Sequence, residues 1–340
     1  DPNNYNHILV GAPNGGAWNT TNGGTTWTPL TDQLANTAMR SVAIDPNSSS
    51  TYFLGTTSGI YKSTNSGATW TKVYNSSTIH KIMIKPDNSQ IIIAATSSNL
   101  IRSTNGGSTW TSLSSVGHFD IEFKPGVPNT VYACASGNIK YSNDGGASWN
   151  NAGGFGGDKC RLAVTDADAD YVYAINDTDA VFRSTNSGIS FSSTGNKTKI
   201  FGGLSWYGMG FSASNTNKNI LFGGCFEFYK STDGGATFNK AISWTWSGNP
   251  STYIHADLHA CESVGAFVFT GSDGGIHKGS TEGTSFVDLT TGLGIREFYC
   301  IGLSKSESGK IVGGAQDNGT AVFRTSDNKW YEFLGADGME

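Results

Sequence analysis

The sequence predicts an all-β fold, a β-propeller of seven or eight four-stranded blades, on three observations. Glycine supplies 45 of the 340 residues, whereas charged residues make up 14%, against about 25% in an average soluble protein. A short box that ends in an aromatic residue recurs along the whole chain. Between the boxes lie short runs of β-branched and aromatic residues bounded by turn residues, without helical periodicity.

The box is clear in the stretch from Ser63 to Trp70, Ser-Thr-Asn-Ser-Gly-Ala-Thr-Trp. Its anchors recur every 39 to 48 residues, at Trp27, Trp70, Trp110, Trp149, Phe191, Phe238, Phe286 and Trp330. A period in the forties with four strands per unit is typical of a propeller. The Asn or Asp accepts hydrogen bonds from later backbone amides, and the glycine takes a positive φ. The box therefore predicts a hairpin turn and a structural role.

Each unit divides into four expected strands. They are 41–44, 51–55, 59–62 and 70–73 in the second unit, and 82–84, 91–95, 100–102 and 110–113 in the third. Asp1-Pro2-Asn3 aligns with Asp45-Pro46-Asn47, which follows an innermost strand, so the innermost strand of the first unit is expected before residue 1. Residues 1–340 are therefore expected to be one propeller segment of eight units from a longer chain with further domains.

Composition also narrows the classes of partner. A net charge of −5 argues against a nucleic-acid partner, because proteins bind nucleic acid through basic stripes that neutralise its phosphates. The longest apolar run, Ile91–Ala95, is far shorter than the roughly 20 residues of a membrane-spanning helix, so no membrane insertion is expected. The five cysteines show no C-x-x-C spacing and are odd in number, which predicts small buried side chains rather than a disulfide framework or a zinc site. We expect no metal and no cofactor.

The boxes resemble the Asp-box, or bacterial neuraminidase repeat, of sialidases, two-propeller xyloglucan hydrolases, sortilin-type receptors and photosystem assembly factors. The C-terminal third extends the resemblance to large secreted Bacteroidota proteins exported by type IX secretion, many of them labelled sortilin-like or glycosyl hydrolase-like. The motifs that carry it include Asp257-Leu-His259, Gly271-Ser-Asp273-Gly-Gly and Gln316-Asp317-Asn318-Gly319. This resemblance implies an extracellular or cell-surface protein.

Two departures from these families weigh against catalysis. Sialidases use three arginines, whereas this chain has six arginines in all and no recognisable sialidase arginine motif. In the xyloglucan hydrolases one catalytic Asp lies in the second turn of the first repeat. The matching position here falls on Pro13 or Asn14, and neither side chain can donate that proton.

A ligand site is expected where the innermost strands begin, because these strand entries share one face with the turns between the second and third strands of each unit. The two longest loops on that face carry non-box aromatics, which suit sugar faces or peptide side chains. The predicted ligand-binding residues are Trp206, Tyr207, Trp244, Trp246, His255, His259, Arg296, Arg40 and Arg161. The alternatives are that the aromatics pack under their own loops and that the polar residues only solvate a wet channel.

Asp257, Asp273 and Asp317 are candidate catalytic carboxylates on the same face, since paired carboxylates perform glycoside hydrolysis. Asp before Gly or Asn-Gly is also an ordinary turn former, and we prefer that interpretation. The sequence thus favours a secreted binding module for glycan or protein. The alternatives are a glycoside hydrolase on the same face and a structural part of a large adhesin or secretion cargo.

Overall fold

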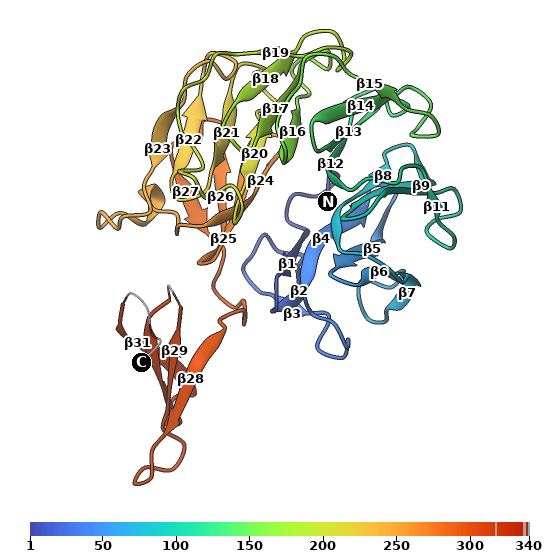
Figure 1. Cartoon of the computed structure of the whole chain (residues 1–340). Coiled ribbons are helices and arrows are strands. Elements are labelled where there is room, and N and C mark those ends of the chain that lie inside the picture. The colour runs from blue at the N-terminus through green and yellow to red at the C-terminus, as the bar shows by residue number, and fades with distance from the viewer. Residues whose placement is uncertain (317, 336–337, 339–340) are drawn as a thin grey trace. The chain divides into compact units, whose positions relative to one another are not determined.

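The computed structural model describes every residue except 317, 336–337 and 339–340. It contains two compact units, Asp1–Leu293 and Gly294–Glu340, and each is described by itself. Eight sequential antiparallel sheets make up the fold, seven in the first unit and one in the second. The predicted all-β propeller is therefore confirmed, and Figure 1 shows the sheets of the first unit following one another in chain order.

The strands of the first unit alternate regularly along the chain. Sheet by sheet they are Ile8–Ala12, Gly16–Thr20 and Thr28–Pro29 (β1–β3); Met39–Asp45, Ser48–Thr56, Gly59–Ser63 and Thr71–Tyr74 (β4–β7); Ile79–Lys85, Asn88–Thr96, Leu100–Ser103 and Thr111–Ser112 (β8–β11); His118–Phe123, Val131–Ala135, Asn138–Ser142 and Asn150–Asn151 (β12–β15); Cys160–Val164, Val172–Asn176, Val181–Ser184 and Ser192–Ser193 (β16–β19); Gly210–Ala213, Leu221–Gly224, Phe228–Ser231 and Asn239–Ile242 (β20–β23); Leu258–Val264, Phe267–Ser272, Gly275–Ser280 and Phe286–Asp288 (β24–β27).

The second unit holds one sheet, formed in order by Phe298–Leu303, Ile311–Ala315, Thr320–Arg324 and Lys329–Leu334 (β28–β31). Among the described residues the only helix is a 3₁₀ turn at Pro250–Thr252 (η1), whose Asn249 side chain accepts a hydrogen bond from the Ser251 amide. Among all the described residues, no helix has the length and the apolar composition that a membrane span requires.

The seven sheets of the first unit close into a ring by side-chain packing. The innermost strands of neighbouring sheets contact one another from β4 through β24. The first sheet has three strands and lacks a counterpart of β4. At its outer edge Trp27 packs with Ile276 and Leu289 of the seventh sheet, and the Trp27 indole donates a hydrogen bond to the Leu289 carbonyl at 2.8 Å. An outer aromatic anchor thus joins the two ends of the ring.

The boxes form the turns between the third and fourth strands. In the copy at 63–70, the Ser63 hydroxyl donates to Asn65 Oδ1 at 2.9 Å and accepts from the Gly67 amide at 2.9 Å, while Asn65 Oδ1 also accepts from the Thr69 amide at 2.9 Å. Gly67 has a φ of +84°, and a Cβ there would meet the Leu30 side chain at 2.8 Å. The box is therefore a self-bonded turn that packs on the preceding sheet.

One cysteine prediction is wrong. Cys134 on β13 and Cys160 on β16 form a disulfide between the fourth and fifth sheets. Cys225 and Cys261 are free and buried, as expected, whereas Cys300 is free and exposed. The bonded side chains are buried, as expected, but neighbouring sheets bring them together across 26 residues of sequence. Spacing along the chain does not reveal this pairing, because it depends on how adjacent sheets stack.

We expect Trp70→Ala to lower the free energy of unfolding by about 2 kcal/mol. A fully buried tryptophan would lose about 3–5 kcal/mol, but the Trp70 indole is half-buried against Tyr52 and donates to the Leu30 carbonyl at 3.0 Å. Denaturant unfolding measures the loss, with Trp206→Ala as control because Trp206 is 69% exposed. An equal loss in both variants would contradict the anchor role.

Candidate functional site

The N-terminal ends of the innermost strands form one face of the first unit. Contacts between neighbouring innermost strands keep the same order along both strands, since Arg161 meets Phe119 and Leu162 meets Asp120, so these strands run in the same direction. The second-to-third strand turns, such as Asp273-Gly274 between β25 and β26, lie on this same face. We call it the strand-entry face and define it by seven side chains: Trp206, Tyr207, Trp244, Trp246, His255, His259 and Asp273.

Tyr207, His259 and Asp273 form a hydrogen-bonded group on this face. The Tyr207 hydroxyl donates to Asp273 Oδ2 at 2.6 Å, and His259 Nε2 contacts Asp273 Oδ1 at 2.7 Å. The Tyr207 and His259 rings meet edge to face, with centroids 4.8 Å apart. Burial alone would raise the pKa of Asp273, but the hydrogen bonds from His259 and Tyr207 outweigh it and lower that pKa. Asp273 is thus held as a carboxylate, which is suited to accept hydrogen bonds and not to donate a proton.

Three tryptophans stand out from the two long loops of this face. Trp206, between β19 and β20, is 69% exposed, and Trp244 and Trp246, between β23 and β24, are 45% and 58% exposed. These indoles are presented to solvent instead of being covered by their own loops. A contact surface for a ligand with flat or apolar faces has this property.

Neighbouring side chains fix the second of these loops. Trp244 contacts Phe226 edge to face at a centroid distance of 5.8 Å, and Trp246 contacts Tyr253 in the same way at 5.4 Å. Glu227 Oε2 accepts a hydrogen bond from the Trp244 amide at 3.2 Å. The indoles are therefore positioned before any ligand arrives, and Phe226 is an aromatic neighbour that the sequence analysis missed.

The predicted cations lie at other strand entries. Arg40 on β4 is exposed, and Arg161 on β16 is half-buried, with its Nη1 donating to the Phe119 carbonyl at 3.0 Å. His255 packs against the turn of Asp273, because a Cβ on Gly274 would lie 2.3 Å from the His255 side chain. His118, at the start of β12, is fully buried, and burial lowers the pKa of its ring to about 4.

Asp257, Arg296 and Asp317 are the remaining predicted residues. Asp257 precedes β24 with a φ of +64°. Burial, followed by the charges of Asp257 and Asp273, raises the pKa of the Cys225 thiol to about 12, so both carboxylates lie near that thiol. Arg296 belongs to the second unit, and Asp317 lies outside the described residues.

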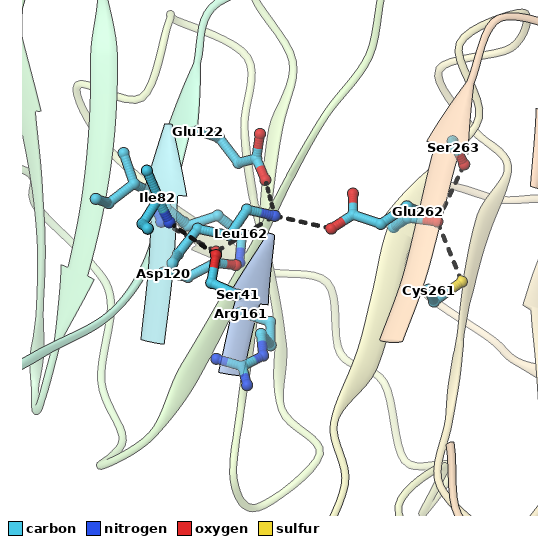
Figure 2. Close-up of polar contacts among 12 residues, drawn as sticks. Ser41, Ile82, Asp120, Glu122, Arg161, Leu162, Cys261, Glu262 and Ser263 are labelled. Atoms are coloured by element: carbon cyan, nitrogen blue, oxygen red, sulfur yellow. Dashed lines mark hydrogen bonds and ion pairs between the residues drawn. The ribbon is translucent and has the colours of Figure 1, made fainter. Parts of the chain in front are cut away.

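Sequence reasoning missed an ionic cluster on the innermost strands. Lys81 Nζ lies 2.8 Å from Glu262 Oε1, 3.2 Å from Glu122 Oε1 and 4.0 Å from Asp120 Oδ1. It thereby joins β8 to β12 and, across the ring, to β24, and Figure 2 shows Glu122 and Glu262 on facing strands. Burial raises the pKa of Glu122 to about 8 in spite of Lys81. The available signal was the alternation of Asp120 and Glu122 with apolar residues in the run 119–123.

A metal site finds no support in the part of the chain that is described, where no group of three or more His, Cys, Asp or Glu side chains could hold an ion.

Comparison with known proteins supports the propeller. Residues 15–134 match the family model described as Sortilin-Vps10 (sortilin, neurotensin receptor 3). An ancestral GH74 enzyme superposes with a TM-score of 0.60 at 17% identity, over 90% of this chain and 47% of the enzyme, so the chain spans about half of that protein. YCF48 from Cyanidioschyzon merolae superposes with a TM-score of 0.57 at 16% identity, over 82% of this chain and 92% of YCF48.

YCF48 bound to D1 peptide superposes with a TM-score of 0.56 at 15% identity, over 80% of this chain and 89% of YCF48. No curated protein sequence matches significantly. Identities this low show a common fold and leave activity and ligand to be argued from the site.

Proposed function

We propose that this propeller is a binding module that recognises a glycan or a protein through the strand-entry face and performs no chemistry of its own. The observation that carries the proposal is the exposure of Trp206, Trp244 and Trp246, at 69%, 45% and 58%, on two loops of one face. Exposed, positioned aromatic rings provide much of the binding energy in such contacts. The Tyr207–Asp273–His259 group adds fixed polar partners beside them.

A glycoside hydrolase on the same face is the second candidate, since a GH74 enzyme shares the fold. Hydrolysis requires one carboxylic acid with a raised pKa to protonate the leaving group. The pKa of Asp273 is lowered, which fits a hydrogen-bond acceptor better than that acid. We therefore favour binding over hydrolysis.

The test begins with a glycan array and a panel of glycosidase substrates, both using the whole chain. For a ligand found there, Trp244→Ala and Trp246→Ala should each weaken binding by about 1–2 kcal/mol, roughly 5- to 30-fold, because each removes an exposed ring from the contact. Calorimetric titration measures this change.

Tyr5→Ala is the matched control. Tyr5 is 38% exposed and packs against Gly265, in the turn between β24 and β25 at the opposite end of the strands. If the chain turns over a glycosidase substrate and Asp273→Asn abolishes this turnover, the protein is the glycoside hydrolase and not the binding module. If both tryptophan variants keep the native affinity, the ligand binds to another surface of the protein.

We also propose that the protein works outside the cell or at its surface, as a secreted Asp-box protein of the Bacteroidota type. The Cys134–Cys160 disulfide supports this location, because disulfides form and persist in oxidising compartments. The self-bonded boxes support the Asp-box assignment. Export by type IX secretion stays a prediction from the C-terminal motifs.

A further inference from the structure

Three cationic side chains gather at the entries of β4 and β16. Arg40 is exposed, and Lys159 and Arg161 are half-buried. His80, at the start of β8, lies among them: burial, and then the charges of Arg161, Arg40 and Lys159, lower its pKa. The His80 ring is in turn stacked on Phe119, at a centroid distance of 5.7 Å and an angle of 7°. We call Arg40, Lys159 and Arg161 the cationic arc.

The cationic arc has no acidic partner among the described residues, where no ion pair involves any of its three members. Arg161 donates to the Phe119 carbonyl, and Lys159 Nζ donates to the Trp206 carbonyl at 3.4 Å. Lys81, one residue beyond His80, is instead surrounded by three carboxylates. On a chain with a net charge of −5, the arc is a local positive surface of the kind that attracts anions.

The contact of Lys159 with Trp206 places the arc beside the aromatic residues of the strand-entry face. Trp206 and Tyr207 are 69% and 42% exposed, with ring centroids 5.5 Å apart. Guanidinium groups pair with carboxylates through two parallel hydrogen bonds, and an exposed indole offers a flat face to a pyranose ring. One ligand that carries both features would satisfy both parts of the surface.

We propose that this surface binds an acidic polysaccharide, whose uronate carboxylates pair with Arg40, Lys159 and Arg161 while a neighbouring sugar ring rests on Trp206. The proposal rests on the proposed binding function and specifies its ligand. An acidic peptide shares the charge, but peptide side chains typically anchor in pockets, whereas Trp206 presents an open face. The acidic polysaccharide is therefore the better match.

The test compares three probes by calorimetric titration of the whole chain: a galacturonate hexamer, a neutral xyloglucan oligosaccharide and poly-L-glutamate. We expect the galacturonate hexamer to bind at least 10-fold more tightly than either other probe at low salt. Raising the salt concentration should weaken the binding of the galacturonate hexamer, because salt screens the charges of the cationic arc. Arg40→Gln with Arg161→Gln should reduce its affinity about 10-fold or more and flatten the salt dependence.

Lys72→Gln is the matched control, since Lys72 is an exposed lysine on β7 outside the arc. Thermal melts confirm folding, and Lys159→Gln repeats the test should the double variant not fold. Equal affinity for the neutral oligosaccharide with no effect of the arc variants would overturn this inference and leave the proposed function standing. Equal or tighter binding of poly-L-glutamate would overturn it in favour of an acidic peptide. If the chain binds none of the three probes and no glycan on the array, both the acidic-polysaccharide inference and the glycan form of the proposed function are wrong.

Discussion

Lys81→Met should lower the free energy of unfolding by about 3 kcal/mol at pH 8. Removing one partner of a buried ion pair typically costs about 3–5 kcal/mol, because the remaining charge is left without compensation. Asp120 and Glu122 are 6% and 15% exposed and lose their cation in this variant, whereas Glu262, 56% exposed, regains water. Because Glu262 is hydrated again in the variant, we expect a loss of stability at the lower end of the range for buried ion pairs. Denaturant titration at fixed pH measures it.

The same cluster predicts the direction of the pH dependence. Burial raises the pKa of Glu122 from 4.5 to about 8, so between these values the folded state holds this proton more tightly than the unfolded state does. The stability contributed by Glu122 is therefore full below pH 4.5 and is lost as the pH rises toward 8. Below pH 6.5 buried histidines with lowered pKa values, such as His118, act in the opposite direction. The fall in stability should therefore be clearest between about pH 6.5 and 8, and Glu122→Gln should flatten it.

Lys81→Met should accordingly be less damaging at pH 5 than at pH 8, since a protonated Glu122 needs no cation. Lys72→Met, at an exposed position on β7, should stay within about 0.5 kcal/mol of the native protein at both values. A loss at Lys81 that is the same at pH 5 and pH 8 would show that the lysine packs there without serving as a counter-ion.

The fold was predictable because its strongest determinants are local. The hydrogen bonds of Ser63 and Asn65 span at most four residues, so the box pattern contains the whole turn. The strands expected at 51–55 and 91–95 are present but longer, at Ser48–Thr56 and Asn88–Thr96. They extend because the tight turns before them let pairing continue, with Asp45 opposite Ser48 and Lys85 opposite Asn88.

The contacts of the site were less predictable because they connect different sheets. Tyr207 and Asp273 are 66 residues apart, and Lys81 and Glu262 are 181 apart. The parallel course of the innermost strands indicates which residues share a face, but not which side chains meet across the ring. That depends on the number of sheets, their twist and the bulges at strand entries, such as the register shift between Ile79 and Lys81.

Loss of the Cys134–Cys160 disulfide should lower the free energy of unfolding by about 3 kcal/mol. Closing a loop of 26 residues removes conformational entropy from the unfolded chain worth roughly 3–4 kcal/mol in the loop-closure model. The bond also joins β13 to β16, and it adds a covalent link to the packing and the hydrogen bonds, such as that from the Leu162 amide to Asp120, that hold the fourth and fifth sheets together. Cys134→Ala combined with Cys160→Ala is the appropriate variant, because it leaves no unpaired thiol.

Two comparisons separate the disulfide from the loss of side-chain volume. Native protein reduced in denaturant and refolded with reductant should lose nearly as much stability as the double variant, although it keeps both sulfur atoms. The double variant should melt at the same temperature with and without reductant. If reduction leaves the native melting temperature unchanged while the double variant is destabilised, the two cysteines stabilise the sheet interface by packing, and the disulfide no longer supports an oxidising compartment.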